Sequence, residues 1–368
     1  RNMFTYTGSL PSTGSALTRV SLTNAGFVTA GKTLTGVADN NEFANLINWY
    51  RGYQITSLTD GLVPVSATSL RRQEMAGALH SRPILVNYGY SGSAEEALKD
   101  PDLQDNVLYF STLEGTLHAV DAKTGLEYFS FLPGEKLAVL PDLFANPTSE
   151  LPEFGMDLTW SVFRHDSNND GKPEKVYIYG GMRMGGSNYY ALDVTDRNNP
   201  KLLFAIKAGS GGYDKLGQTW SQPTVAAIRY KGDVRNVIIF GGGYDAQHEV
   251  SDIVYAADSV GNAVYIADAE TGQLLEAVSA SDNADMKFSV VAQPKTLDAT
   301  GDGLVDHIYF GDLGGQVFRV DLDNRTSATG LVVRAKTLAK VGQTGSGGGV
   351  ANQRRFYEPP TVALFMDA

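Results

Sequence analysis

The chain has 368 residues, a net charge of −11 and no cysteine. The acidic balance argues against a nucleic-acid-binding surface, which needs a basic patch, and the lack of cysteine excludes thiolate catalysis, cysteine-ligated zinc and disulfides. No apolar run reaches the roughly 18 residues expected of a membrane span. At this length the chain is either two average domains or one large all-β domain.

Forty glycines and many short apolar runs predict short strands joined by tight turns. In chain order, the first helix is expected at residues 41–51, where apolar residues recur at helical spacing. Residues 90–105 are predicted to form an acidic loop with a short helix, and residues 133–158 a Pro-rich insertion. Residues 342–349 have the Gly/Ser-rich composition of a flexible loop.

Four segments repeat one pattern, in which an apolar strand, a Gly-containing turn and a second strand ending in Asp follow one another. They are residues 106–126, 175–197, 252–273 and 307–325. Such a repeat is typical of propeller blades, and it favours a β-propeller over an irregular β-sandwich. We therefore predict an all-β fold: one irregular β-propeller domain over residues 1–368, with loop and short-helix insertions. Seven blades are expected, although the sequence does not fix their number, and we interpret the chain as a fragment of a longer protein.

Two nine-residue stretches carry the pattern of a short calcium loop. Each has oxygen-bearing side chains at positions 1, 3 and 5, a glycine at position 6 and a carboxylate at position 9. Calcium takes about six to eight hard oxygen ligands, and alternate residues of a turning loop can converge on one ion. The predicted ligands of the first loop are Asp166, Asn168, Asp170, the Lys172 carbonyl and Glu174. Those of the second loop are Asp298, Thr300, Asp302, the Leu304 carbonyl and Asp306.

The bidentate Glu that usually closes a calcium loop is missing, because Tyr177 and Tyr309 stand at its position. Glu174 and Asp306 would therefore close the two sites. Asp/Asn/Gly-rich stretches also form turns without a metal, which is the alternative interpretation. Clustered carboxylates repel one another without a cation, so we predict Ca²⁺ in both loops.

Other patterns point to no chemistry. Residues 26–33 match the P-loop letters, but no apolar helical period follows them, and we interpret the match as chance. The five histidines lack zinc-ligand spacing, and there is no Gly-x-Ser-x-Gly elbow. We predict no catalytic residue and no enzyme activity. Trp49, Trp160 and Trp220 are expected in the blade core.

Several stretches, collinear over roughly residues 45–325, resemble the PilY/PilC proteins of type IV pili. Their common order is more specific than any single motif. The matching stretches are residues 48–52, 78–83, 108–126, 185–196, 216–224, 241–248 and 298–323.

The resemblance implies the C-terminal β-propeller of an extracytoplasmic protein at the bacterial cell surface, the type IV pilus tip or the outer membrane. It implies roles in pilus assembly, in opposing retraction, and in twitching motility and adhesion. The family's calcium site falls on Asp298, Thr300, Asp302, Leu304 and Asp306; Thr300 replaces the usual Asn or Asp, and the first loop is extra to the commonest pattern.

The partners implied are pilus subunits or the pilus assembly machinery, with host-cell receptors as further candidates; no nucleic acid and no membrane span are expected in this chain. Two alternatives stay open. One is a quinoprotein-like dehydrogenase propeller, and the other is a purely structural, calcium-stapled propeller.

Overall fold

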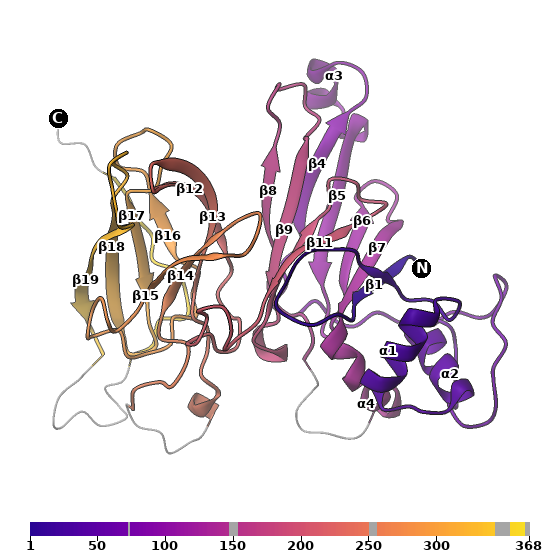
Figure 1. Ribbon diagram of the computed structural model, residues 1–368. Helices are drawn as coiled ribbons and strands as arrows, with labels where there is room; N and C mark the ends of the chain where they lie inside the picture. Colours follow the sequence, from indigo (N-terminus) through magenta and orange to yellow (C-terminus); the bar gives the residue numbers. More distant parts are fainter. Residues whose placement is uncertain (73, 147–153, 250–255, 343–353, 365–368) are drawn as a thin grey trace.

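In the computed structural model, residues 1–72, 74–146, 154–249, 256–342 and 354–364 are described (Figure 1). These residues form four sheets, of six, five, four and four strands. Each sheet is built on four strands that follow one another in the chain and pair antiparallel. This is the blade pattern that the repeat predicts, and it confirms the all-β propeller class.

The first two sheets also take in strands from the N-terminal segment, since β1 and β3 extend the first sheet and β2 the second. The first sheet has the order β3-β1-β7-β6-β5-β4, with bounds Thr18–Arg19, Met3–Tyr6, Glu127–Pro133, Leu117–Asp121, Gln104–Ser111 and Ile84–Tyr90. The second has the order β2-β11-β10-β9-β8, with bounds Ser12–Ser15, Lys201–Ile206, Tyr189–Asp193, Lys175–Gly181 and Ser161–His165.

The third and fourth sheets are plain four-stranded meanders. The third has the order β12-β13-β14-β15, with bounds Thr224–Tyr230, Asp233–Gly241, Val264–Asp268 and Leu274–Val278. The fourth has the order β16-β17-β18-β19, with bounds Lys295–Leu297, His307–Gly311, Gln316–Leu322 and Val332–Lys340.

Apolar side chains fill the space between consecutive sheets, in one cluster for each of the three junctions. The first strands of successive sheets also meet directly. Thr159 donates from Oγ1 to the His80 carbonyl at 3.1 Å, just before β8 and β4 begin, and Thr224 of β12 donates to the Pro294 carbonyl, just before β16, at 2.6 Å. The first strand of each sheet therefore lies innermost, as in a propeller.

Short helices lie beside the first sheet (Figure 1). Helices α1 (Ala25–Thr35), α2 (Asn40–Tyr50) and α4 (Leu140–Ala145) share a buried apolar cluster with side chains of β1 and β7. The helix expected at residues 41–51 is α2, and the short helix expected within 90–105 is α3 (Ala94–Lys99). None of the described helices is long and apolar enough to cross a bilayer.

Three further segments singled out in the sequence can be compared with the structure. The P-loop letters at residues 26–33 lie inside α1, so the segment forms a helix and not a phosphate-cradling loop. Within residues 133–158, a 3₁₀ turn at Gly134–Val139 and helix α4 cover the first half, while 147–153 lie outside the described residues. The Gly/Ser segment 342–349 also lies outside them, apart from Gly342.

The third repeat was assigned to the wrong strand pair. The sequence places its first strand at the start of residues 252–273, but β14 pairs with β13, which precedes that range. Residues 250–255 lie outside the described residues. The segment that forms β13 and the start of residues 252–273 are both short and apolar in sequence, so the pattern alone does not show which of them pairs with β14.

Trp160 links the first two sheets. Its side chain is fully buried in their shared cluster, and its indole Nε1 donates to Ser111 Oγ of β5 at 2.7 Å. The indole packs so closely on β9 that a Cβ at Gly180 would come within 2.4 Å of the ring. A smaller residue at position 160 therefore opens a cavity that this tight junction cannot easily close.

We expect Trp160→Ala to lower the free energy of unfolding by about 3–5 kcal/mol, because a buried aromatic is lost from a packed core. Trp160→Phe should cost clearly less, since it loses the hydrogen bond to Ser111 but keeps most of the ring volume. Guanidinium denaturation of both variants checks this, with Leu126→Ala, at a side chain 71% exposed, as the surface control. Equal loss from Trp160→Ala and Leu126→Ala would contradict the assigned role.

Candidate functional site

The two predicted calcium loops occupy equivalent places in the second and fourth sheets. Residues 166–174 join β8 to β9, and residues 298–306 join β16 to β17. Each is the connection between the first and second strand of its sheet. In the third sheet the same connection is a tight hairpin at Lys231–Gly232. In the first sheet the connection is longer, residues 91–103, and contains helix α3, so the nine-residue loop occurs in the second and fourth of the four described sheets.

The backbones of the two loops follow the same path. Position 4 has a positive φ in both loops, 56° at Asn169 and 79° at Gly301. Position 6 does so as well, with 86° at Gly171 and 85° at Gly303. Asn and Gly are the residues that tolerate this left-handed region, which explains their presence at these positions.

The carboxylate at position 1 holds the turn in both loops. The Gly171 amide donates to Asp166 Oδ2 at 3.0 Å, and the Gly303 amide donates to Asp298 Oδ2 at 2.8 Å. At position 5 of the second loop, Asp302 Oδ1 accepts a hydrogen bond from the Leu304 amide at 2.9 Å. At position 5 of the first loop, Asp170 Oδ1 accepts the equivalent bond from the Lys172 amide.

The carboxylate at position 9 closes each loop by accepting a backbone hydrogen bond. The Ser167 amide donates to Glu174 Oε2, and the Ala299 amide donates to Asp306 Oδ2, both at 2.8 Å. Positions 1, 5 and 9 thus make matching hydrogen bonds in two loops that differ at most other positions.

A cation of the protein, Arg164 on β8, lies beside the first loop. Arg164 Nη2 donates to the Gly171 carbonyl at 2.7 Å and lies 3.4 Å from Asp166 Oδ2. The other oxygen, Asp166 Oδ1, is buried and has no hydrogen-bond partner. A buried carboxylate oxygen without a donor is unfavourable, and a bound cation would satisfy it.

The second loop depends on neutral donors. Asn324 Nδ2 donates to Asp306 Oδ1 at 3.1 Å, and Thr300 Oγ1 donates to Asp298 Oδ1 at 3.3 Å. The side chain of Leu304 is buried beneath the loop.

The residues present fit a hard cation by their chemistry. Both loops offer carboxylate, amide or hydroxyl, and carbonyl oxygens, which are the ligands that calcium prefers. The Gly303 N–H bond lowers the pKa of Asp298, and the Ser167 N–H bond lowers that of Glu174, so both stay ionised. Within the part of the chain that the structure describes, no three His, Cys, Asp or Glu side chains converge in a metal-binding arrangement. Coordination of calcium thus stays a prediction for both loops.

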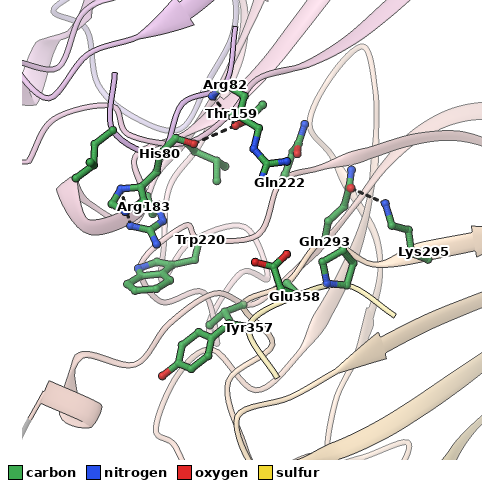
Figure 2. A pocket seen from close by; sticks show the side chains of 15 residues that line it. His80, Arg82, Thr159, Arg183, Trp220, Gln222, Gln293, Lys295, Tyr357 and Glu358 are labelled. Carbon is green, nitrogen blue, oxygen red and sulfur yellow. Dashed lines mark hydrogen bonds between the residues drawn. The ribbon is translucent and has the colours of Figure 1, made fainter. Parts of the chain in front are cut away.

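A cavity of about 430 Å³ opens at the opposite end of the innermost strands (Figure 2). It is bordered by the residues that precede or begin β4, β8, β12 and β16, together with residues 357–359. Because each innermost strand starts at this cavity and two of them end at an acidic loop, the cavity and the loops lie at opposite ends of β8 and β16. We call it the axial cavity.

One wall of the axial cavity is a fixed group of side chains around Arg183. Arg183 has a φ of 51°, and its guanidinium lies over the Trp220 ring at 4.1 Å from the centroid. Arg183 Nη1 lies 2.9 Å from His80 Nδ1 and 3.5 Å from the buried Asp157 carboxylate. Burial lowers the pKa of Arg183, an effect that the charge of Asp157 opposes.

Tyr244 also stacks on Trp220, at a centroid distance of 4.3 Å. Among the three tryptophans, Trp160 confirms the expectation of a core position, Trp49 is buried with the helices, and Trp220 lines the cavity instead.

The sequence did not identify the cavity-lining residues. A signal for several of them exists, because the first strands of the sheets are preceded by a polar residue and a proline. These pairs are Arg82-Pro83, Gln222-Pro223 and Gln293-Pro294, and Glu358-Pro359 repeats them. Proline fixes an extended entry into a strand, and the residue before it faces the cavity.

The fold and this site define a β-propeller with acidic loops between strands and a polar cavity on its axis. The family described as the PilY1 beta-propeller domain matches residues 81–342, which is most of the chain. The chain belongs to this family.

Two curated relatives and one solved structure document the similarity. The chain is 26% identical over 290 residues to the type IV pilus biogenesis factor PilY1 of Pseudomonas aeruginosa strain UCBPP-PA14, covering 75% of the chain and 23% of the relative. It is 29% identical over 230 residues to a PilY1 homolog of Xylella fastidiosa, covering 59% of the chain and 14% of that protein. The crystal structure of the P. aeruginosa PilY1 C-terminal domain aligns with a TM-score of 0.43 at 24% identity, covering 64% of this chain and 45% of that one. The chain thus spans less than a quarter of the length of these curated relatives.

A buried carboxyl group lies close to the axial cavity. Asp312, in the loop after β17, accepts the amides of Gly314 and Gln316, both at 2.9 Å. Its carbonyl accepts the Phe356 amide at 3.1 Å, next to the segment that borders the cavity. Burial raises the pKa of Asp312 to about 7, and the charge of Asp258 adds to the effect.

This pKa predicts a pH dependence of stability. Between about pH 4 and 7 the folded state holds a proton on Asp312 that the unfolded state has lost, so its contribution to stability falls as pH rises across that range. We expect Asp312→Asn to remove this contribution and to reduce the loss of unfolding free energy between pH 5 and 8 by about 1 kcal/mol or more. Chemical denaturation of both proteins at the two pH values measures it; identical pH profiles would refute the assignment.

Proposed function

We propose that this chain is the calcium-binding β-propeller of a type IV pilus biogenesis and adhesion factor. The family supports the link to pilus biogenesis, because the curated relatives carry that name. The observation that carries the calcium assignment is the repetition of one loop geometry, with matching hydrogen bonds at positions 1, 5 and 9, in two sheets. The chain would act outside the cytoplasm, at the cell surface or pilus tip. It would support pilus assembly, oppose retraction and enable twitching motility.

Calcium would be held by the same oxygen atoms that the sequence identifies. In the second loop these are the side chains of Asp298, Thr300, Asp302 and Asp306 with the Leu304 carbonyl, and in the first loop Asp166, Asn168, Asp170 and Glu174 with the Lys172 carbonyl. A bound ion would supply positive charge at a cluster of carboxylates. The protein's part would be to align these carboxylates through backbone N–H groups, which donate to Asp166, Asp298, Glu174 and Asp306.

A loop ordered by calcium would then also order the protein surface around the loop. Each loop sits between two strands that are otherwise joined only by their ladder, so fixing the loop fixes the end of the sheet. A surface that meets pilus subunits or the assembly machinery would change between an ordered and a loosened state, biased by calcium. Host-cell receptors are a second class of partner proposed for the same surface.

The alternative of a quinoprotein-like dehydrogenase finds little support at the axis. A planar cofactor stacked on Trp220 would have to compete with Arg183 and Tyr244, which already lie against its ring. The role proposed for the chain is therefore a non-enzymatic one. The purely structural alternative, in which calcium only staples the blades, makes a different prediction about cells: Asp306→Ala would lower thermal stability but leave twitching motility intact.

Calorimetric titration of the intact protein with calcium tests the proposal. We expect two sites, one lost in Asp170→Ala and the other in Asp302→Ala, because each variant removes a ligand that also holds its loop. Asp233→Ala is the matched control, since Asp233 follows the short hairpin at the equivalent connection of the third sheet. Arg164→Gln should tighten the first site, because it removes a competing cation.

The outcomes separate the alternatives. If calcium binding is lost only in Asp302→Ala, and Asp170→Ala has no effect, the first loop is a turn that binds no metal. Unchanged binding in both variants would overturn the calcium assignment altogether, while leaving the family and the fold as they stand.

A further inference from the structure

We propose that the axial cavity is a binding site for a carboxylate-bearing ligand, held by Arg82 and Lys295. The proposal is independent of the calcium loops, which lie at the other end of the innermost strands. It is built on the charges that line the cavity, the partners that these charges have and lack, and the size of the space (Figure 2).

Arg82 offers an unused guanidinium. Its backbone amide donates to Thr159 Oγ1 at 2.9 Å, which fixes the residue at the rim. Its side chain is exposed to the cavity, and no acceptor among the described residues takes up its guanidinium N–H groups. A guanidinium has a planar fork of donors that matches the two oxygens of a carboxylate. This makes Arg82 the primary anchor.

Lys295 contributes a second cation across the cavity. Its Nζ donates to Gln293 Oε1 at 2.9 Å, which uses one of three N–H donors and orients the ammonium group. The chain as a whole is strongly acidic, with a net charge of −11. Arg82 and Lys295 therefore give the cavity positive charge with unused donors, although the chain as a whole is negative.

The wall around Arg183 makes the cavity rigid and removes one source of repulsion. The buried Asp157 carboxylate is paired with His80 and lies 3.5 Å from Arg183 Nη1, so its negative charge is balanced within the wall. Arg183 sits in the left-handed region with a φ of 51°, a strained conformation that the stacking on Trp220 helps to hold. Such strain is commonly kept where a side chain must be positioned.

Glu358 sets the limit on the ligand's charge. Its carboxylate is exposed, points into the cavity in Figure 2, and has no basic partner within the described residues. Glu358 would repel a compact ligand with several negative charges more strongly than a ligand with one carboxylate. A volume of about 430 Å³ is within the range of small-ligand pockets. It would take a small organic acid or a few residues of an acidic polypeptide, and both present the same carboxylate.

Titrations of the intact protein at low ionic strength with propionate and with a blocked tripeptide that carries a single glutamate, acetyl-Gly-Glu-Gly-amide, test the site. Binding of either probe supports it, and competition between the two shows one shared site; binding of the peptide alone identifies a polypeptide as the source. Arg82→Gln should weaken binding by about tenfold or more, since a charge-assisted pair is lost, and Lys295→Gln should weaken it by a smaller factor. Arg235→Gln is the matched control, because Arg235 is a half-exposed arginine on β13, outside the cavity lining.

Glu358→Gln provides a test of opposite sign. Removing its charge should tighten binding of both probes by about threefold or more, an effect that general destabilisation cannot produce. The proposal is overturned if neither probe binds, if Arg82→Gln binds as the wild type does, or if Arg235→Gln weakens binding as much as Arg82→Gln. A weakening in Glu358→Gln would equally overturn the charge arrangement.

Discussion

The face-to-face packing of one sheet on the next is the constraint on which the rest of this structure depends. A four-stranded meander alone would expose an apolar face, and only the neighbouring sheet can cover it. Trp160 shows how tight that requirement is, because its indole fills the junction and bonds to the adjacent sheet. Once the sheets stack, their first strands are forced together on one axis, and the residues before these strands must share one cavity.

The same constraint separates two kinds of site. Connections between first and second strands emerge at one end of the sheets, where length and charge can vary without disturbing the junctions. Residues entering the first strands converge at the other end, where space is limited and side chains from several sheets meet. Strand β16 spans only Lys295–Leu297, so the axial cavity and the second acidic loop are joined by a single short strand. Lys295 of the cavity lining is therefore only three residues before Asp298 of the second loop.

Local patterns explain why much of this could be predicted from the sequence. The acidic loops were found because their ligand spacing and their glycines lie within nine consecutive residues. The blade repeat was found for the same reason, and it failed only at the third unit, where two apolar segments compete for β14. The axial cavity could not be found in this way, because Arg82, Arg183 and Lys295 are brought together only by the stacking of the sheets. Their positions depend on long-range packing and leave no spacing in the sequence.

The two acidic loops are alike in backbone but unlike in electrostatics, and this difference bears on how each would use a cation. In the first loop Arg164 already supplies positive charge beside Asp166, so part of the carboxylate repulsion is balanced by the protein itself. In the second loop the donors that Asp298 and Asp306 find among the described residues are neutral, namely backbone amides, Thr300 and Asn324. Opposite charge stabilises a carboxylate cluster more than neutral hydrogen bonds do. If calcium binds as proposed, the order of the second loop should therefore depend on calcium more steeply than that of the first.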